Sequence, residues 1–239
     1  MKYILLSVIC LSFLGCSTAQ LQTAWSNTKY ASYAAATDPV TWAPLATGVT
    51  LYATGADDHM TDYIMKNNRL TSENDEIYRE INGIETYATA LQIKDKEDTT
   101  KLKRVIAETV GFNSAKITTN ILSSAVDKEN PSHTGDNAIG SHHALDPFAG
   151  SAMNRRNVAQ LDIPTWGKYT LNGISYFTAA SSALIRVQDG GHSLGDQLVS
   201  ASIGNFIGLF FHDLLMREDT RLNVSLYSDS AYLYAGWSF

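Results

Sequence analysis

Apolar residues recur at helical spacing along most of this chain, and this periodicity constrains its fold more than any other feature. Residues three and four positions apart lie on the same face of a helix, so each stretch can bury one face against its neighbours. The pattern covers residues 42–53, 60–65, 77–93, 102–126, 144–158, 166–187 and 194–216. It predicts an all-α fold in which these helices form a bundle.

Helix-capping residues stand near several of the expected helix starts. Asp57 and Asp58 precede the second stretch, and Ser72 precedes an acidic turn ahead of the third. Ser193 is followed three residues later by Asp196, which is the spacing of a capping box. Because such side chains accept hydrogen bonds from the first backbone N–H groups of a helix, they support the expected starts.

Residues 221–239 break the helical pattern, because apolar and polar residues alternate there with a period of two. Leu222, Val224 and Leu226 alternate with polar residues, and Ser-Asp-Ser at 228–230 offers a turn. Alternation on both sides of a turn is typical of two paired strands. We therefore expect a C-terminal β-hairpin of residues 221–239.

The first residues have the features of an export signal. Lys2 is followed by an apolar run, residues 3–14, which is too short to span a bilayer. The run ends in Phe-Leu-Gly-Cys at 13–16, which resembles the bacterial lipobox, where the cysteine is lipidated and becomes the new N-terminus. Residues 1–16 are therefore expected to be a signal peptide with Cys16 as the lipidation site. The alternative is an ordinary cleaved signal with an incidental cysteine.

A lipid on Cys16 would place the protein in the bacterial cell envelope, as a membrane-anchored lipoprotein facing the periplasm. Residues 17–36 are expected to form a polar tether, and residues 37–220 a single helical domain. Cys10 lies inside the signal, so the mature chain keeps only Cys16 and no internal disulfide can form. Its stability must therefore come from packing.

Charge and spacing argue against two classes of partner. A net charge of -6 and a pI of about 5.4 leave no basic surface for nucleic acid. Asp57, Asp58, His59 and Asp62 could bind a divalent cation, but helix capping explains the first two equally well. The histidines show no recognised zinc spacing. The oligomeric state stays open.

One glycine-rich segment between two expected helices, residues 186–196, brings together groups that could transfer a phosphoryl group. Gly190 and Gly191 allow a sharp turn, and His192 would stand at the start of the next helix, where free N–H groups favour an anion. The planar guanidinium of Arg186 can donate two hydrogen bonds to phosphate oxygens. Asp196 can accept a hydrogen bond from one ring nitrogen of His192, so that the other nitrogen can attack. The alternative is structural: Asp196 completes a capping box, and Arg186 neutralises a helix C-terminus.

The spacing Arg-x5-His-x3-Asp of this segment resembles the third signature of the phosphatidic acid phosphatase type 2 and vanadium haloperoxidase superfamily. Upstream, Gly140-Ser141-His142-His143-Ala144 looks like the second signature, usually Pro-Ser-x-His-Ala. Here Gly140 replaces the proline and His142 the usual glycine or serine. Over residues 40–216 the chain is similar to the lipoprotein-type bacterial members, which implies a bundle of the acid phosphatase and vanadium haloperoxidase type.

The first signature of this superfamily, a lysine followed seven residues later by Arg-Pro, is degenerate in this chain. Its best match is residues 122–131, where Ser123 occupies the lysine position and Asn130 the arginine position. Lys128 lies nearby and could substitute. Each lost charge-assisted contact would weaken the binding of a phosphate dianion by about 1.5–3 kcal/mol.

The resemblance implies a role for each matching residue. His192 would attack phosphorus to form a phosphohistidine, Asp196 would orient its ring, and His143 would protonate the leaving alcohol. No metal or other cofactor is required, and vanadate would be one only in a haloperoxidase. The residues expected to bind the phosphate group are Arg186, Ser141, His142 and Lys128.

These features support three hypotheses of function. The first is a phosphatase that hydrolyses phosphate monoesters or pyrophosphates, membrane lipid phosphates among them, through a phosphohistidine. The second, favoured by Ser123 and Asn130, is a catalytically weak or inactive member that binds phosphate groups or a protein partner. Vanadate-dependent halide oxidation is the third and least favoured, since lost cations would weaken vanadate binding at least as much.

Overall fold

The computed structural model describes residues 18–67, 70, 74–94, 98–126, 128–133, 139–218, 220–226 and 231–237. Most of these residues are helical, so the predicted all-α class is confirmed. The elements are α2 (Thr18–Ala36), α3 (Pro39–Thr54), α4 (Ala56–Lys66), α5 (Asp75–Gln92), α6 (Asp98–Ala125), α7 (His142–Gln160), α8 (Thr165–Gln188), α9 (Leu194–Leu215), β1 (Thr220–Leu226) and β2 (Ala231–Trp237).

Each helix predicted from the apolar periodicity overlaps one observed helix, from α3 to α9, with ends that differ by a few residues. The capping box of Ser193 and Asp196 is present at the start of α9. The prediction that Asp57 and Asp58 precede and cap their own helix was wrong, because α4 begins at Ala56 and both aspartates lie in its first turn. Ser72 lies outside the described residues.

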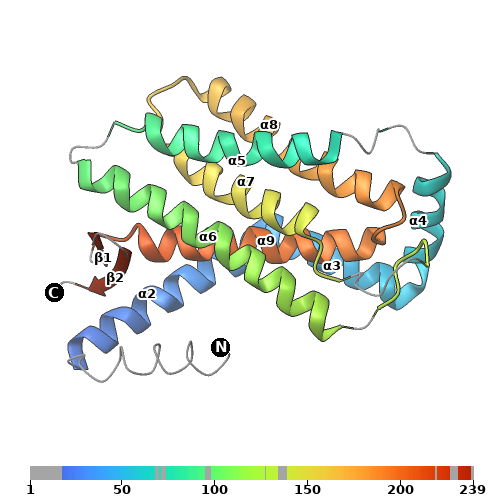
Figure 1. Cartoon of the computed structure of the whole chain (residues 1–239), viewed down its shortest axis with the longest axis horizontal. Helices are drawn as coiled ribbons and strands as arrows, with labels where there is room; N and C mark the ends of the chain where they lie inside the picture. Colours follow the sequence, from blue (N-terminus) through green and yellow to red (C-terminus); the bar gives the residue numbers. More distant parts are fainter. Residues whose placement is uncertain are drawn as a thin grey trace.

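Helix α9 lies at the centre of the bundle and packs against α7, α3, α6 and α2 (Figure 1). Its contact with α7 is close, because a Cβ at Gly204 or Gly208 would overlap the backbone carbonyls of Leu145 and Ala149. Leu145 and Ala149 are fully buried there, in a cluster with Ile207. Glycine is therefore the residue that lets the two backbones approach.

The same helix is long and apolar enough to cross a membrane, with a mean hydropathy of 1.4 over its best window. Inside the molecule, 56% of that window is buried. A central helix of a bundle has this composition for reasons of packing, so length and apolarity alone are weak evidence for a span.

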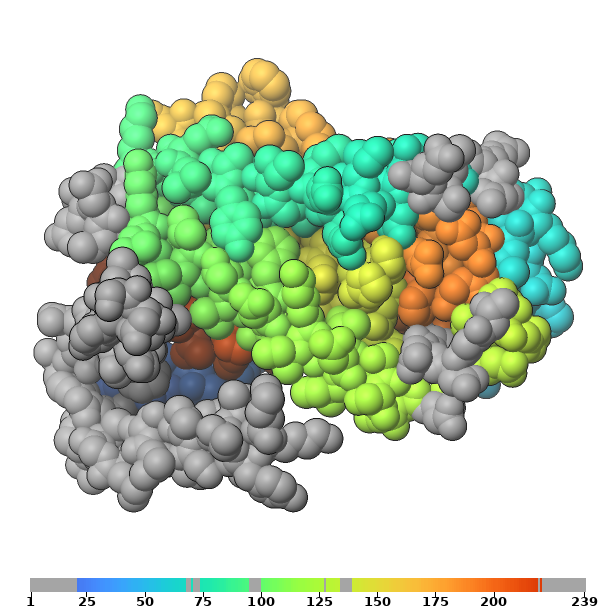
Figure 2. Space-filling model, in the orientation of Figure 1, coloured from blue at the N-terminus to red at the C-terminus, as the bar shows by residue number. Residues whose placement is uncertain are grey.

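Helices α5, α7 and α8 form a second packed group whose interior is polar. Asn82 on α5 donates to Ser151 on α7 at 2.8 Å and to Ser175 on α8 at 3.2 Å. Thr89 donates to Asn154 at 2.6 Å. All five side chains are buried, so these hydrogen bonds fix how the three helices align. Figure 2 shows α5 and α6 covering one face of the molecule, with α7 visible between them.

The prediction of a polar tether over residues 17–36 was wrong for residues 18–36, which form α2. Ala24, Asn27, Ala31 and Ala35 recur at helical spacing and are buried, on the side of α2 that packs against α9. The segment contains no glycine or proline and only one charged residue, Lys29, and alanine is the strongest helix former. The predicted signal peptide and lipidation site, residues 1–16, lie outside the described residues.

Strands β1 and β2 pair antiparallel, with Val224 opposite Leu233 and Leu226 opposite Ala231. Residues 227–230, which join the two strands, lie outside the described residues. The β-hairpin expected for residues 221–239 therefore stays a prediction.

Candidate functional site

The glycine-rich turn joins α8 to α9 and carries His192, while Arg186 lies in the last turn of α8 and Asp196 in the first turn of α9. Gly190 has a φ of 70°, a left-handed conformation that glycine adopts readily. The carbonyl of Arg186 accepts hydrogen bonds from the N–H groups of Gly191 at 3.0 Å and His192 at 3.2 Å, which closes the turn. Ser132 donates its N–H to the Gly190 carbonyl at 3.0 Å, so the loop that follows α6 packs directly on this turn.

The guanidinium of Arg186 lies against the backbone of Gly191, where a Cβ would come within 2.8 Å of Nη2. Its Nη1 atom is 3.9 Å from Asp189 Oδ2, and about a third of the side chain is exposed (32%). Within the described residues its buried Nε has no hydrogen-bond partner. Arg186 therefore keeps donor capacity for an anionic ligand.

His143 is held by a carboxylate that the sequence did not point to. Its Nδ1 lies 2.6 Å from Oδ2 of Asp75, and Oδ1 of Asp75 accepts from Ser182 at 2.6 Å. Burial would raise the pKa of Asp75, but the contacts with His143 and Ser182 and the charge of Arg186 outweigh it and hold that pKa below its usual value. Because Nδ1 of His143 faces this carboxylate, Nε2 is the ring nitrogen that lies on the side away from Asp75.

His142 packs beside His143, with the ring centroids 3.9 Å apart. Burial, followed by the positive charges of His143, Arg79, His192 and Arg186, lowers the pKa of His142 to about 4. At neutral pH His142 is therefore uncharged. Burial is the larger cause, and the guanidinium groups of Arg79 and Arg186, which stay charged, add a positive potential that favours an anion. His142 thus packs against His143, and the charges of His192 and Arg186 act on it, while the catalytic roles of these residues stay predictions.

Asp196 is fully buried, and its contacts are those of a capping residue. Oδ2 accepts from the N–H of Ser193 at 3.0 Å, while Oδ1 accepts from the hydroxyl of Tyr52 at 2.5 Å and from Lys128 at 2.8 Å. Burial and the neighbouring carboxylate raise the pKa of Tyr52 far above its usual value. The capping alternative is confirmed, and the orienting of His192 by Asp196 stays a prediction.

The start of α9 is not open to an external anion, contrary to the sequence-based expectation. The N–H of Gly195 donates to Oδ1 of Asp57 at 2.7 Å, and the N–H of Leu194 donates to Thr61 at 3.0 Å. The third donor is taken within the capping box. Asp57 is 4% exposed, so a buried carboxylate from α4 already occupies the positive end of this helix.

Lys128 serves this internal carboxylate cluster, which weakens its predicted role in phosphate binding. Its Nζ is 2.8 Å from Asp196 and 4.0 Å from Asp57, and it lies 4.6 Å from the centre of the Tyr52 ring. The adjoining cavity, of about 330 Å³, is also lined by Asp58, Asp62 and Glu129. Carboxylates at this density repel a phosphate dianion.

The segments of the first and second signatures meet where α6 ends. Gly140 has a φ of 89°, a value that proline cannot adopt, and a Cβ there would lie 2.9 Å from Leu122 and 3.2 Å from the nitrogen of Ser123. Glycine adopts this conformation readily, so this position suits glycine and excludes proline. Ser141 is buried and accepts from Gln197 at 3.1 Å, so it fastens α7 to α9.

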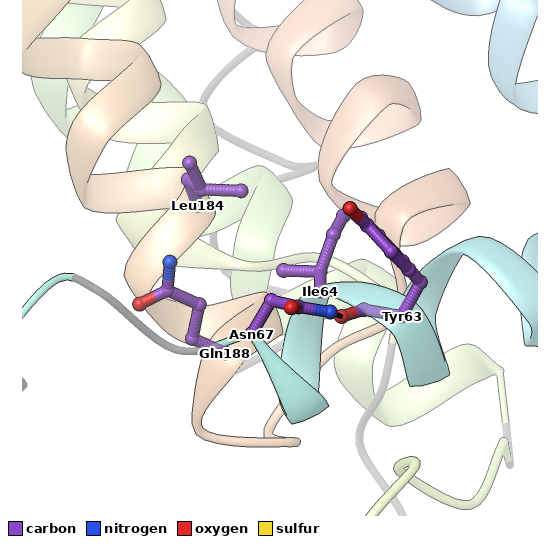
Figure 3. A pocket seen from close by; sticks show the side chains of 5 residues that line it. All are labelled: Tyr63, Ile64, Asn67, Leu184 and Gln188. Carbon is purple, nitrogen blue, oxygen red and sulfur yellow. Dashed lines mark hydrogen bonds between the residues drawn. The ribbon is translucent and has the colours of Figure 1, made fainter.

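Two further cavities flank α8. One, of about 240 Å³ between α8 and α9, is lined by apolar side chains and Gln197. The other, of about 320 Å³ between α4 and α8, is lined by Tyr63, Ile64, Asn67, Leu184 and Gln188 (Figure 3). Because Gln197 also binds Ser141, the apolar cavity adjoins the second-signature segment.

No family model, no curated protein and no solved structure matches this chain. Within the described ranges, no three histidine, cysteine, aspartate or glutamate side chains are grouped to hold a metal ion. The function is therefore inferred from the geometry of the site.

Proposed function

We infer that this chain hydrolyses phosphoric esters at the histidine cluster, defined as His142, His143 and His192 with Arg186. The observation that carries this inference is the contact of 2.6 Å between Asp75 Oδ2 and His143 Nδ1, which lies beside an uncharged His142 on which the charges of Arg79 and Arg186 act. A carboxylate that fixes one nitrogen of an imidazole and leaves the other for substrate is a common arrangement for proton transfer.

Each group has a distinct task in the proposed reaction. Arg186 binds the equatorial oxygens of phosphorus, and His192 attacks to form a phosphohistidine as the alcohol leaves. His143 enters this step as the imidazolium, with its Nδ1–H against Asp75, and gives the alcohol its proton from Nε2. Water then attacks the phosphohistidine, His143 takes the proton of that water, and phosphate is released.

The bundle in this proposal is of the acid phosphatase and vanadium haloperoxidase type, with a C-terminal hairpin. Phosphate monoesters and pyrophosphates with an apolar leaving group, such as lipid phosphates, are the proposed substrates. The apolar cavity between α8 and α9 supports that class, because it adjoins Ser141 through Gln197. In the cell envelope such substrates lie in the membrane.

The test is phosphate release by the chain lacking residues 1–16, which retains every described residue, from lipid and soluble phosphate esters. His192→Ala should abolish release and also the alkali-stable, acid-labile label expected of a phosphohistidine. His143→Ala should slow alkyl phosphates far more than p-nitrophenyl phosphate, whose leaving group needs no proton. His59→Ala, on the exposed side of α4, is the matched control and should behave as wild type.

One observation favours the second candidate, a protein that binds phosphate groups without turnover. Lys128, the only lysine near the missing cations of the first signature, is paired with Asp196 and Asp57. If phosphate binds to the wild type and binding is lost in Arg186→Ala, while no ester in the panel is hydrolysed, the binding protein replaces the enzyme. Halide oxidation with vanadate is not proposed, because it needs at least as many cations.

A further inference from the structure

Helices α2 and α3 carry large apolar side chains on their solvent-facing sides. We call this the α2–α3 surface and define it by Trp25, Tyr30, Tyr33, Trp42, Leu45 and Val49, all of which are exposed. Trp25 is 63% exposed, Tyr33 73% and Trp42 54%. Exposed apolar residues of this size, gathered on two consecutive helices, mark an interaction site more often than residues scattered singly do.

Packing inside the bundle does not account for these side chains. The buried faces of the two helices consist mostly of small or polar residues, such as Ala31 and Ala35 on α2 and Thr41 and Gly48 on α3, although Leu51 is buried as well. The six residues of the α2–α3 surface are exposed instead. An amphipathic helix of a globular protein normally has the opposite arrangement, with its polar face toward water.

The surface carries few charges, and one of them comes from outside the two helices: the guanidinium of Arg217 lies 4.9 Å from the ring centre of Tyr30. Between residues 18 and 54 the chain has two charged residues, Lys29 and Asp38. Asp38 is bound by Arg155 at 2.5 Å and caps α3 through the N–H of Val40 at 3.0 Å. Lys29 is therefore the one exposed charge among these residues, and its Nζ lies 5.8 Å from the ring centre of Trp25.

We propose that the α2–α3 surface docks on a lipid bilayer. Helix α2 begins at Thr18, two positions after Cys16, so an acyl chain on that cysteine would hold the helix within roughly 7 Å of its attachment point. Tryptophan and tyrosine rings favour the boundary between headgroups and acyl chains, and Lys29 suits anionic headgroups. The occupant is thus a membrane, reached by an anchor with almost no tether.

The test uses the chain from residue 17 onward, which carries no lipid and retains every described residue. Its partitioning onto vesicles of phosphatidylethanolamine with a minority of phosphatidylglycerol is measured by co-flotation. The combined variant Trp25→Glu/Trp42→Glu should lower the partition coefficient by about a hundredfold, or about tenfold per tryptophan. Trp166→Glu, whose tryptophan is 72% exposed on α8, is the matched control and should bind as wild type.

Quenching by lipids brominated along the acyl chain supplies a second readout. The wild type should lose tryptophan fluorescence, and the combined variant should not. The proposal is overturned if the wild-type chain stays in solution with vesicles, or if Trp166→Glu reduces binding as much as the combined variant. A further outcome also overturns it: vesicles bind nothing, and sedimentation shows a dimer of the wild type that the combined variant does not form. The occupant of the surface is then a second copy of the chain. None of these measurements depends on phosphatase activity.

Discussion

Asp75 contacts His143 and Ser182 with the two oxygens of one carboxylate. These contacts determine which ring nitrogen of His143 faces a ligand. In Asp75→Asn the negative charge is lost and the ring can exchange tautomers. We expect kcat/KM for an alkyl phosphate to fall by about tenfold to hundredfold, with a smaller loss for p-nitrophenyl phosphate. The measurement is a pH profile of both substrates. Glu80→Gln, at an exposed position of α5, is the control; equal loss in both variants would refute the positioning role.

The sequence predicted His143 but not its partner, and the reason is distance along the chain. Asp75 stands at the start of α5, where a carboxylate is also explained by the helix dipole, so nothing local distinguishes it. The spacing of His192 and Asp196 fits a capping box as well as a catalytic pair, and only the structure shows that Oδ1 of Asp196 is bound by Tyr52 and Lys128.

Asp146 provides a test of stability against pH that does not involve catalysis. It is 6% exposed, and burial raises its pKa to about 6, with only partial compensation from Lys116 and Arg79. A carboxyl whose pKa is higher in the folded state stabilises the protein below its unfolded pKa of 3.8, and that contribution is lost as pH rises through about 6. Asp146→Asn should therefore raise the free energy of unfolding by about 1–3 kcal/mol at pH 8, relative to its effect at pH 4.

Urea unfolding of wild type and variant at the two pH values measures this difference. Asp162→Asn, at an exposed position after α7, is the matched control and should change nothing at either pH. A variant that is less stable than wild type at pH 8 would show that ionised Asp146 is stabilised by its neighbours.

At the scale of elements, one glycine lies in a close contact between two helices and another lies next to open space. Gly208 on α9 approaches Ala149 on α7 so closely that a Cβ would overlap its carbonyl, whereas Gly173 on α8 has no atom within 4 Å of such a Cβ. Gly208→Ala should destabilise the protein by about 1–3 kcal/mol through overpacking. Gly173→Ala should stabilise it by about 0.5–1 kcal/mol through helix propensity. Thermal unfolding measures both, and effects of the same sign would contradict this packing of α7 on α9.

The sequence predicted α3 to α9 because each contains large apolar residues at helical spacing. It missed α2 because the buried face of that helix consists of alanines and Asn27, which carry little hydrophobic signal. The large apolar residues of α2 are those that remain exposed. The sequence pattern therefore did not indicate α2, because this helix packs through small side chains.

At the scale of the whole molecule, the α2–α3 surface connects the N-terminus to the candidate site. Helix α2 begins near the strands, and the turn between α8 and α9 lies at the other end of the bundle (Figure 1). Helix α3 spans between them, and near its end Tyr52 reaches Asp196. A bilayer against α2 and α3 would therefore extend toward the histidine cluster, where a phosphate headgroup could enter from the membrane surface.

The role of α2 in the whole fold can be tested by removing it. A tether can be deleted without loss of stability, but deletion of residues 17–36 uncovers the side of α9 around Leu209, which is buried against Ala35. We expect the melting temperature to fall by roughly 5 °C or more, measured by circular dichroism without vesicles. Trp25→Ser/Tyr33→Ser, on the outward side of α2, should leave the melting temperature unchanged. An unchanged melting temperature after the deletion would show that residues 17–36 act as a tether. Cys16 would then not be held close to the folded domain, and the proposed membrane docking would lose the support of that short link.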